Sequence, residues 1–335
     1  MHLIINTKGS SFRREGECFV ITTNNQTKVA AKKVDQITLA TAVSISTDAI
    51  NLAIEHGIGI TLVDKYGKVY GRVWEPSIKK SAEVRRKQLL LRENVIGAQL
   101  VRFWLTNKIS KQQYVLNKFK RGVGKGKVDN INSGVLQMEE YKKTIAALLT
   151  SNTIPIIQNK VQAYEGNCSK IYFSLLNELL PVQYQFKGRS QRPAKDMFNA
   201  LLNYSYGILY GYIEQACVLA GLDPYIGVMH TDRYNKPVLS YDLIELFRHY
   251  TDMFIIELCR AEALDISHFD VDEFGAYYLN YGGKGIFFSE FNQLLAEKKR
   301  YRHKLMKFKE IFEYEALQLS RFIMKDGDHD YIINV

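Results

Sequence analysis

The sequence has few cysteines, few prolines and no long apolar run. Its four cysteines lie far apart without a CxxC pair, which excludes a zinc ribbon and a secreted disulfide framework. Six prolines argue against low-complexity linkers. The N-terminus has no basic segment followed by a long apolar one, so we expect no signal peptide and a cytoplasmic protein. The longest uncharged stretch, residues 197–213, contains Asn and Ser and predicts a buried helix rather than a membrane span.

The length and the apolar content indicate a folded protein of more than one domain. The chain has 335 residues, of which 46% are hydrophobic and 24% are charged. At roughly 150 residues per domain this length predicts about two domains. The apolar fraction is ordinary for a chain with a buried core, and it excludes disorder for most of the sequence.

The positive charge is concentrated in one segment. The chain contains 45 Lys and Arg against 35 Asp and Glu, a net charge of +10. Residues 86–127 contain 11 basic residues and one acid, Glu93, which leaves 34 of each sign elsewhere. Such a local excess suits a polyanionic partner. The alternative is a basic helix face that is merely solvated.

The first 75 residues predict a small β-rich domain that carries one helix. β-Branched and aromatic runs separated by turn residues predict strands at 3–5, 18–23, 36–39, 58–63 and 69–74. Residues 48–56 predict a helix, because an acidic start and apolar spacing are followed by Gly57. Pro76 and Ser77 close this domain, and we therefore expect a first domain over residues 1–78.

From residue 79 the apolar pattern becomes helical. After one or two helices within 79–105, helical spacing predicts further helices at 135–163, 170–178, 196–220, 241–263 and 287–325. The fold class is thus α+β: a β-rich N-terminal domain followed by a large all-α domain over residues 79–335. Between the helices, Arg121–Lys127 contains three glycines and predicts a mobile basic loop. It lacks the spacing of a nucleotide-binding loop, and its role stays open.

The segment after residue 164 contains a candidate acidic ligand. Glu165 is followed by Gly166, by Cys168 and Ser169, and then by Lys170 and two aromatic residues. This composition predicts a closely packed helix start, at which an acid is favoured by the helix dipole. Glu165 taken alone is therefore explained as a helix N-terminal charge.

A second acidic cluster follows a histidine. Asp242 and Glu245 are three residues apart, on one helical face among apolar residues, and Ser240 could cap this helix. Buried carboxylates are costly unless they are paired or bind a cation. The alternatives are an ion pair between Glu245 and Arg248 and a hydrogen-bonded loop position for His230.

A basic cluster precedes a helix at residue 196. Arg189, Arg192 and Lys195 lie directly before Asp196, and the polar Asn199 and Asn203 share its helical face. Basic side chains at a helix start could hold phosphate, whereas the polar face could equally contact solvent or a neighbouring helix.

Taken together, these motifs resemble the CRISPR-associated adaptation integrase family. The resemblance rests on four motifs in order: Glu165-Gly with Tyr172-Phe173; Arg192-Pro with Asp196, Asn199-Ala-Leu-Leu-Asn203-Tyr204 and Tyr206; Gly227 with His230; and Tyr241-Asp242-Leu243 with Glu245 and Phe247-Arg248. It extends over nearly the whole chain, including the β-rich N-terminus. Each motif is weak alone, but the four in this order and with these intervals are highly specific.

The resemblance implies a metal site. Glu165, His230 and Glu245 match the family's three metal-ligand positions, where they would also be the catalytic residues. Asp242 matches an acidic position beside the metal, and would act through a ligand or as an occasional ligand. Two carboxylates and an imidazole suit Mg²⁺ or Mn²⁺ rather than structural zinc. Lys170 stands where arginine is frequent in the family, which gives up bidentate phosphate contact for a point charge.

The resemblance also implies the activity and the partners. We expect a metal-dependent DNA endonuclease and integrase, a nuclease of the hydrolase class, that inserts spacers into CRISPR arrays by 3′-hydroxyl transesterification. It would act on double-stranded DNA as a homodimer, bridged to a second dimer by a small adaptation subunit. The predicted DNA-binding residues are Arg86, Lys170, Arg189, Arg192, Lys195 and Arg248. The alternatives are an endonuclease specific for branched DNA and a DNA-binding scaffold without catalysis.

Overall fold

The computed structural model of the chain describes residues 1–64, 69–73, 81–232, 234, 236–328 and 330–332. The chain forms two compact units. The first contains Met1–Ile78, Arg192–Gln215 and Ala263–Phe312, and the second contains Lys79–Gln191, Ala216–Glu262 and Glu313–Val335. The division into domains at residue 78 stays a prediction, because Pro76 and Ser77 lie outside the described residues.

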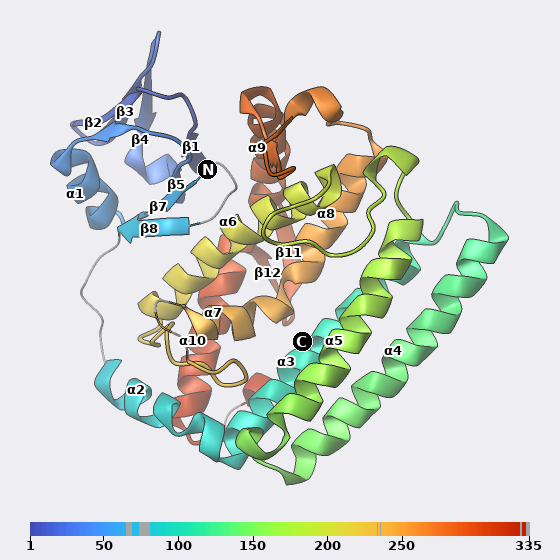
Figure 1. Cartoon of the computed structure of the whole chain (residues 1–335). Coiled ribbons are helices and arrows are strands. Elements are labelled where there is room, and N and C mark those ends of the chain that lie inside the picture. Colours follow the sequence, from blue (N-terminus) through green and yellow to red (C-terminus); the bar gives the residue numbers. More distant parts are fainter. Residues whose placement is uncertain (65–68, 74–80, 233, 235, 329, 333–335) are drawn as a thin grey trace. The chain divides into compact units, whose positions relative to one another are not determined.

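Two four-stranded sheets build the N-terminal region (Figure 1). One has the order β1-β5-β7-β8, with strands His2–Ile5, Gln36–Leu39, Gly59–Val63 and Val69–Val73. Its first three strands are parallel, and β8 pairs antiparallel with β7. The other has the order β4-β3-β2-β6, with strands Gln26–Ala30, Cys18–Thr22, Ser11–Glu15 and Ser44–Ile45. Together with α1 (Thr47–Glu55), the sheets bury one apolar core.

The apolar runs predicted five strands of these two sheets. All five predicted strands are confirmed, as is the helix α1, which Ser46 caps and which ends before Gly57 at φ +62°. Strands β2, β4 and β6 were not predicted. They carry too few apolar residues for the pattern, and β4 has no fully buried residue.

The rest of the chain is mostly helical, which confirms the predicted fold class. Its helices are α2 (Ser81–Leu89), α3 (Val95–Phe119), α4 (Lys125–Ser151), α5 (Ile154–Glu178), α6 (Met197–Leu219), α7 (Val238–Leu243), α8 (Arg248–Arg260), α9 (Tyr281–Ala296) and α10 (Phe308–Met324). Figure 1 shows α3, α4 and α5 side by side in the second unit. No helix in the described part of the chain is long and apolar enough to cross a membrane.

Two predicted helices have different boundaries in the structure. The helix expected at 135–163 is broken at Asn152, and α5 then runs without interruption through residue 178. Pro155 accounts for this start, because its fixed φ and missing N–H suit the first turn of a helix. Glu165 is therefore in the middle of α5, and the predicted helix start at this residue was wrong.

The helix expected at 287–325 is interrupted by a hairpin. Strands β11 (Lys298–Tyr301) and β12 (Lys304–Lys307) separate α9 from α10. The two turn residues, Arg302 and His303, have φ of 43° and 65°, as a tight hairpin turn requires. Neither is Gly or Asn, so the usual sequence signal for this turn is missing. A second short hairpin pairs β9 (Phe269–Val271) with β10 (Tyr277–Leu279).

Two helical glycines of the second unit give a matched test of its packing. A Cβ at Gly97, in the first turn of α3, would collide with the backbone carbonyl of Leu91, whereas a Cβ at Gly166 in α5 would meet nothing within 4 Å. We expect Gly97→Ala to lower the free energy of unfolding by about 1–3 kcal/mol. Gly166→Ala should raise it by roughly 0.5–1 kcal/mol through helix propensity. Urea unfolding checks both, and equal effects would contradict the described contact at Gly97.

Candidate functional site

One buried and one partly buried carboxylate meet at a buried lysine in the second unit. Lys108 lies in α3, Glu165 in α5, and Glu245 in the short 3₁₀ turn Ile244–Leu246 that follows α7. The Lys108 ammonium forms an ion pair with Glu165 Oε1, and lies 2.9 Å from Glu245 Oε2. The side chains of Lys108, Glu165 and Glu245 are 9%, 21% and 8% exposed. Three segments far apart in sequence therefore converge on one positive charge.

The charges around Glu245 keep it ionised. Burial alone would raise the pKa of its carboxyl, but the charges of Arg248 and Lys108 outweigh burial and lower this pKa to about 2. Arg248 Nε donates to Glu245 Oε2 at 3.1 Å, so the ion pair considered from the sequence is present. Burial would likewise lower the pKa of Lys108, but the charges of Glu165 and Glu245 raise it above its ordinary value.

The second part of the candidate site is the pair of His230 and Asp242. Asp242 is buried in α7, and its Oδ1 accepts a hydrogen bond of 2.6 Å from His230 Nδ1. It also accepts from the backbone N–H groups of Val228, Met229 and His230. Because the carboxylate accepts, Nδ1 carries the ring proton, and Nε2 forms no hydrogen bond to the described residues. Ser240 lies inside α7, which starts at Val238, so the predicted cap at Ser240 was wrong.

The two groups are electrostatically coupled. Burial would lower the pKa of His230, but the hydrogen bond and charge of Asp242, together with the charge of Glu245, raise it. The described part of the chain contains no group of three His, Cys, Asp or Glu side chains gathered closely enough to hold an ion. The structure instead joins Glu165 to Glu245 through Lys108, and His230 to Asp242.

Sequence reasoning missed Lys108. It lies on the apolar stripe of α3, three residues after Leu105 and next to Ile109, both of which are buried. A lysine at helical spacing within such a stripe must find a negative partner, because an unpaired buried ammonium is costly. This signal was present in the sequence.

The predicted DNA-binding residues lie in different surroundings. Arg86 in α2, Lys170 in α5 and Arg192 are exposed. Arg189 belongs to the second unit and lies over the Phe173 ring, whereas Arg192 and Lys195 belong to the first unit. Lys195 Nζ donates to the carbonyl of Phe274, and Arg248 pairs with Glu245. DNA binding by these residues stays a prediction.

Much of the basic segment 86–127 is engaged within the second unit. Six of its 11 basic side chains bind carboxylates, carbonyls or amides of the chain itself: Lys87, Arg92, Lys108, Lys118, Lys120 and Lys127. The segment is therefore in part an internal network rather than a uniformly free basic face.

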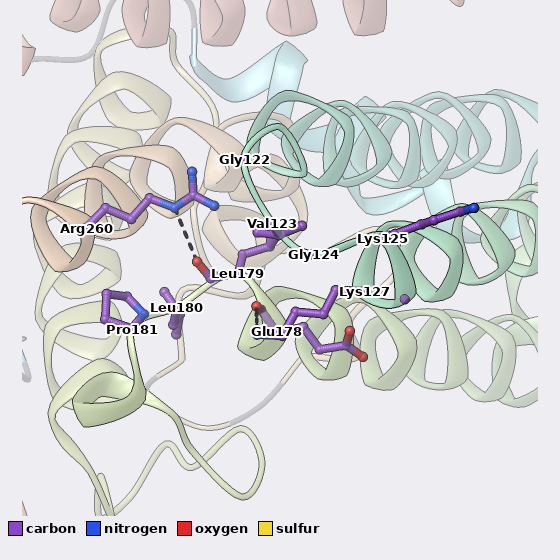
Figure 2. Close-up of a pocket in the computed structure, with 11 residues that line it drawn as sticks. Gly122, Val123, Gly124, Lys125, Lys127, Glu178, Leu179, Leu180, Pro181 and Arg260 are labelled. Atoms are coloured by element: carbon purple, nitrogen blue, oxygen red, sulfur yellow. Dashed lines mark hydrogen bonds between the residues drawn. The ribbon is translucent and has the colours of Figure 1, made fainter.

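The glycine-rich segment borders a cavity of about 590 Å³ (Figure 2). The predicted loop was wrong for Lys125–Lys127, which form the first turn of α4 after Gly124. Lys127 Nζ donates to the Glu178 carbonyl at the end of α5, and Arg260 donates to the carbonyls of Leu179 and Phe119. These cations satisfy carbonyls at helix C-termini, which is a structural role.

Three solved structures share this fold. A CAS1 protein from Thermotoga maritima has a TM-score of 0.80 at 20% identity and covers 97% of both chains. A casposase bound to its integration product also has a TM-score of 0.80 at 20% identity, covering 99% of this chain and 93% of its own. A chain of a Cas6-RT-Cas1–Cas2 complex has a TM-score of 0.77 at 19% identity, over 97% of this chain and 35% of its own. The fold is thus one found in CRISPR-associated proteins.

The sequence comparisons identify the family. The family model described as "CRISPR associated protein Cas1" matches residues 3–293. The CRISPR-associated endonuclease Cas1 1 of Archaeoglobus fulgidus is 30% identical over 262 residues, which cover 74% of each chain. The chain belongs to the Cas1 family, and the resemblance stated from the sequence motifs is confirmed.

Two lysines of α3 test the buried charge cluster. We expect Lys108→Met to lower the free energy of unfolding by about 3–5 kcal/mol, because it leaves buried Glu245 and partly buried Glu165 without their shared cation. Lys118 pairs with Glu257 at the surface, where both side chains are at least 40% exposed. The matched Lys118→Met should cost roughly 0–1 kcal/mol. Urea unfolding at neutral pH measures both, and equal losses would contradict the central role of Lys108.

Proposed function

We propose that this chain is a metal-dependent DNA endonuclease and integrase that inserts short DNA fragments into CRISPR arrays. The observation that carries the proposal is the convergence of Glu165 and Glu245 on one cation, coupled to a histidine whose Nε2 is available. Membership of the Cas1 family supports nuclease activity, since its relatives are named endonucleases. The casposase of similar fold, bound to its integration product, supports integration.

The donor set fits Mg²⁺ or Mn²⁺. Carboxylate oxygens and one imidazole nitrogen suit these ions, and none of the three proposed ligands is a thiolate, the ligand that structural zinc sites favour. The ammonium between Glu165 and Glu245 marks a position where the fold stabilises positive charge. Asp242 fixes the ring of His230 through Nδ1, as carboxylates commonly do for metal-binding histidines. Glu165, Glu245 and His230 would hold the ion, and Asp242 would orient His230.

The reaction is a phosphoryl transfer between DNA strands. A donor 3′-hydroxyl attacks a target phosphorus in line, a new P–O bond forms, and the bond to the leaving 3′-oxygen breaks. Water in place of the hydroxyl gives strand cleavage by the same chemistry. A bound Mg²⁺ or Mn²⁺ supplies stabilisation of the charge that develops on the phosphate. Arg248 keeps Glu245 ionised and oriented, and no side chain becomes a covalent nucleophile.

The expected partners are DNA, a second copy of the chain and a small adaptation subunit. The exposed Arg86, Lys170 and Arg192 would contact phosphates without reading sequence. The similar fold in a Cas6-RT-Cas1–Cas2 complex supports a Cas2-type subunit as the bridging partner. Homodimer formation through the β-rich region follows from the family resemblance.

A strand-transfer assay tests the proposal. Labelled duplex with free 3′-hydroxyls is mixed with supercoiled plasmid, with the small partner subunit present or absent and with Mn²⁺ or EDTA. We expect Mn²⁺-dependent label on the plasmid, and we expect Glu165→Gln to reduce it to the EDTA level. Glu178→Gln, on the same helix but at its exposed C-terminal end, is the matched control and should retain transfer.

The other outcomes of this assay point to the alternatives. Cleavage without joining, even with the partner subunit, would identify an endonuclease that acts on branched DNA. DNA binding with neither reaction would identify a scaffold, in which Lys108 permanently neutralises the two glutamates.

The role of Asp242 has its own test. We expect Asp242→Asn to weaken Mn²⁺ binding by about 10- to 100-fold, because an amide cannot accept all the hydrogen bonds that hold the loop and ring of His230. Asp232→Asn is the matched control, since exposed Asp232 accepts one hydrogen bond from Gly227 in the same loop. Calorimetric titration with Mn²⁺ in the absence of DNA measures both. Equal affinities for Asp242→Asn and the wild type would contradict the positioning role.

A further inference from the structure

A second cavity, of about 360 Å³, lies within the first unit at the carboxyl ends of its parallel strands. Asn6 follows β1, Ala40–Ala42 follow β5, and Asp64 follows β7. Residues from β9 to the first turn of α9 complete its lining: Asp270, Tyr278–Tyr281 and Lys284. The carboxyl edge of parallel strands is where α/β sheets commonly bind ligands.

Lys284 is the unusual group in this cavity. Its residue is only 9% exposed, yet among the described residues no carboxylate lies within ion-pairing distance and no acceptor bonds its Nζ. Burial lowers its pKa, although the charges of Asp64 and Asp270 oppose this shift. The nearby Tyr204 ring lies 6.0 Å from Nζ, and its buried hydroxyl also has no hydrogen-bond partner in the described part of the chain. The Lys284 ammonium borders the cavity without an acceptor among the described residues, so it can donate to a ligand there.

The charges of the lining restrict the ligand. The described lining residues include the ammonium of Lys284 and the carboxylates of Asp64 and Asp270. A cation would meet the Lys284 ammonium and an anion would meet the two carboxylates, so the ligand that fits this lining is a neutral group. Such a ligand must accept a hydrogen bond from the Lys284 ammonium and donate hydrogen bonds to the carboxylates. Tyr70 and Tyr281, each 65% exposed at the rim, offer ring faces for a flat group.

We propose that this cavity binds an unpaired nucleobase and prefers guanine. Guanine is neutral and flat; its N1–H and N2–H₂ edge donates to a carboxylate, while O6 and N7 accept from a lysine ammonium. Thymine has one N–H donor and fits less well. Stacking on the tyrosines adds affinity that does not depend on the base. The inference rests on the proposed function only for the source of the base, a DNA strand; a free guanine nucleotide presents the same ring.

Fluorescence anisotropy in EDTA tests the base preference without requiring catalysis. The probes are labelled oligothymidylates of eleven residues in which the central base is G, C, A or T, and the protein is the full chain. We expect the G probe to bind about 5- to 100-fold more tightly than the all-T probe, the range of one good bidentate contact. Because EDTA suppresses strand transfer, failure of the proposed function would leave this result unaffected.

Three variants tie the preference to the cavity. Lys284→Met and Asp270→Asn should each reduce the preference for G, and because Asp270 is exposed, its variant tests the proposal even if Lys284→Met fails to fold. Lys32→Met, at an exposed lysine of the same unit, should keep it. Displacement of the G probe by GMP would support the cavity with a free nucleotide as ligand. A G preference without displacement by GMP would support a base within a strand. Equal affinity for all four probes, or a G preference retained in both cavity variants, would overturn the proposal.

Discussion

The second unit depends on the cost of placing buried Glu245 and partly buried Glu165 away from water. Glu165 and Glu245 come from segments 80 residues apart, and both lie largely away from water, where an unpaired carboxylate is costly. Lys108 supplies the positive charge that pairs with both and so connects α3, α5 and the turn after α7. The same interaction links the two carboxylates, and Arg248 together with Lys108 keeps Glu245 ionised. A divalent ion at this site would therefore take over a charge balance that the fold already requires.

A separate set of hydrogen bonds, all to Asp242, holds His230 in place. Asp242 binds the ring and three successive backbone N–H groups, so the loop that carries His230 has little freedom. Gly227 closes this loop, since a Cβ there would collide with the carbonyl of His230. The spacing from Gly227 to His230 thus reflects a steric requirement of the loop. Asp242, which follows in the sequence, supplies the acceptor that the backbone N–H groups of this loop need.

The sequence predicted the features that depend on local patterns. Apolar runs located five strands of the two sheets, and Gly57 located the end of α1. The four spaced motifs identified the family. Other features were missed: Glu165 was assigned to a helix start, although Pro155, a local signal, begins that helix ten residues earlier. The hairpin at 298–307 was missed because no Gly or Asn marks its turn, and Lys108 was missed because its partners are distant in sequence.

The engagement of the basic segment affects how the chain attracts DNA. Each cation that already binds a carbonyl or carboxylate of the protein releases no counterion from a DNA phosphate. Of the segment's 11 basic side chains, six are used in this way, so its formal charge overstates the number of phosphates it can neutralise. The excess of lysine and arginine, which first suggested a polyanionic partner, serves in large part to hold helix ends and acids together. Long-range attraction arises from the total charge, but contact is left to a smaller set of exposed side chains.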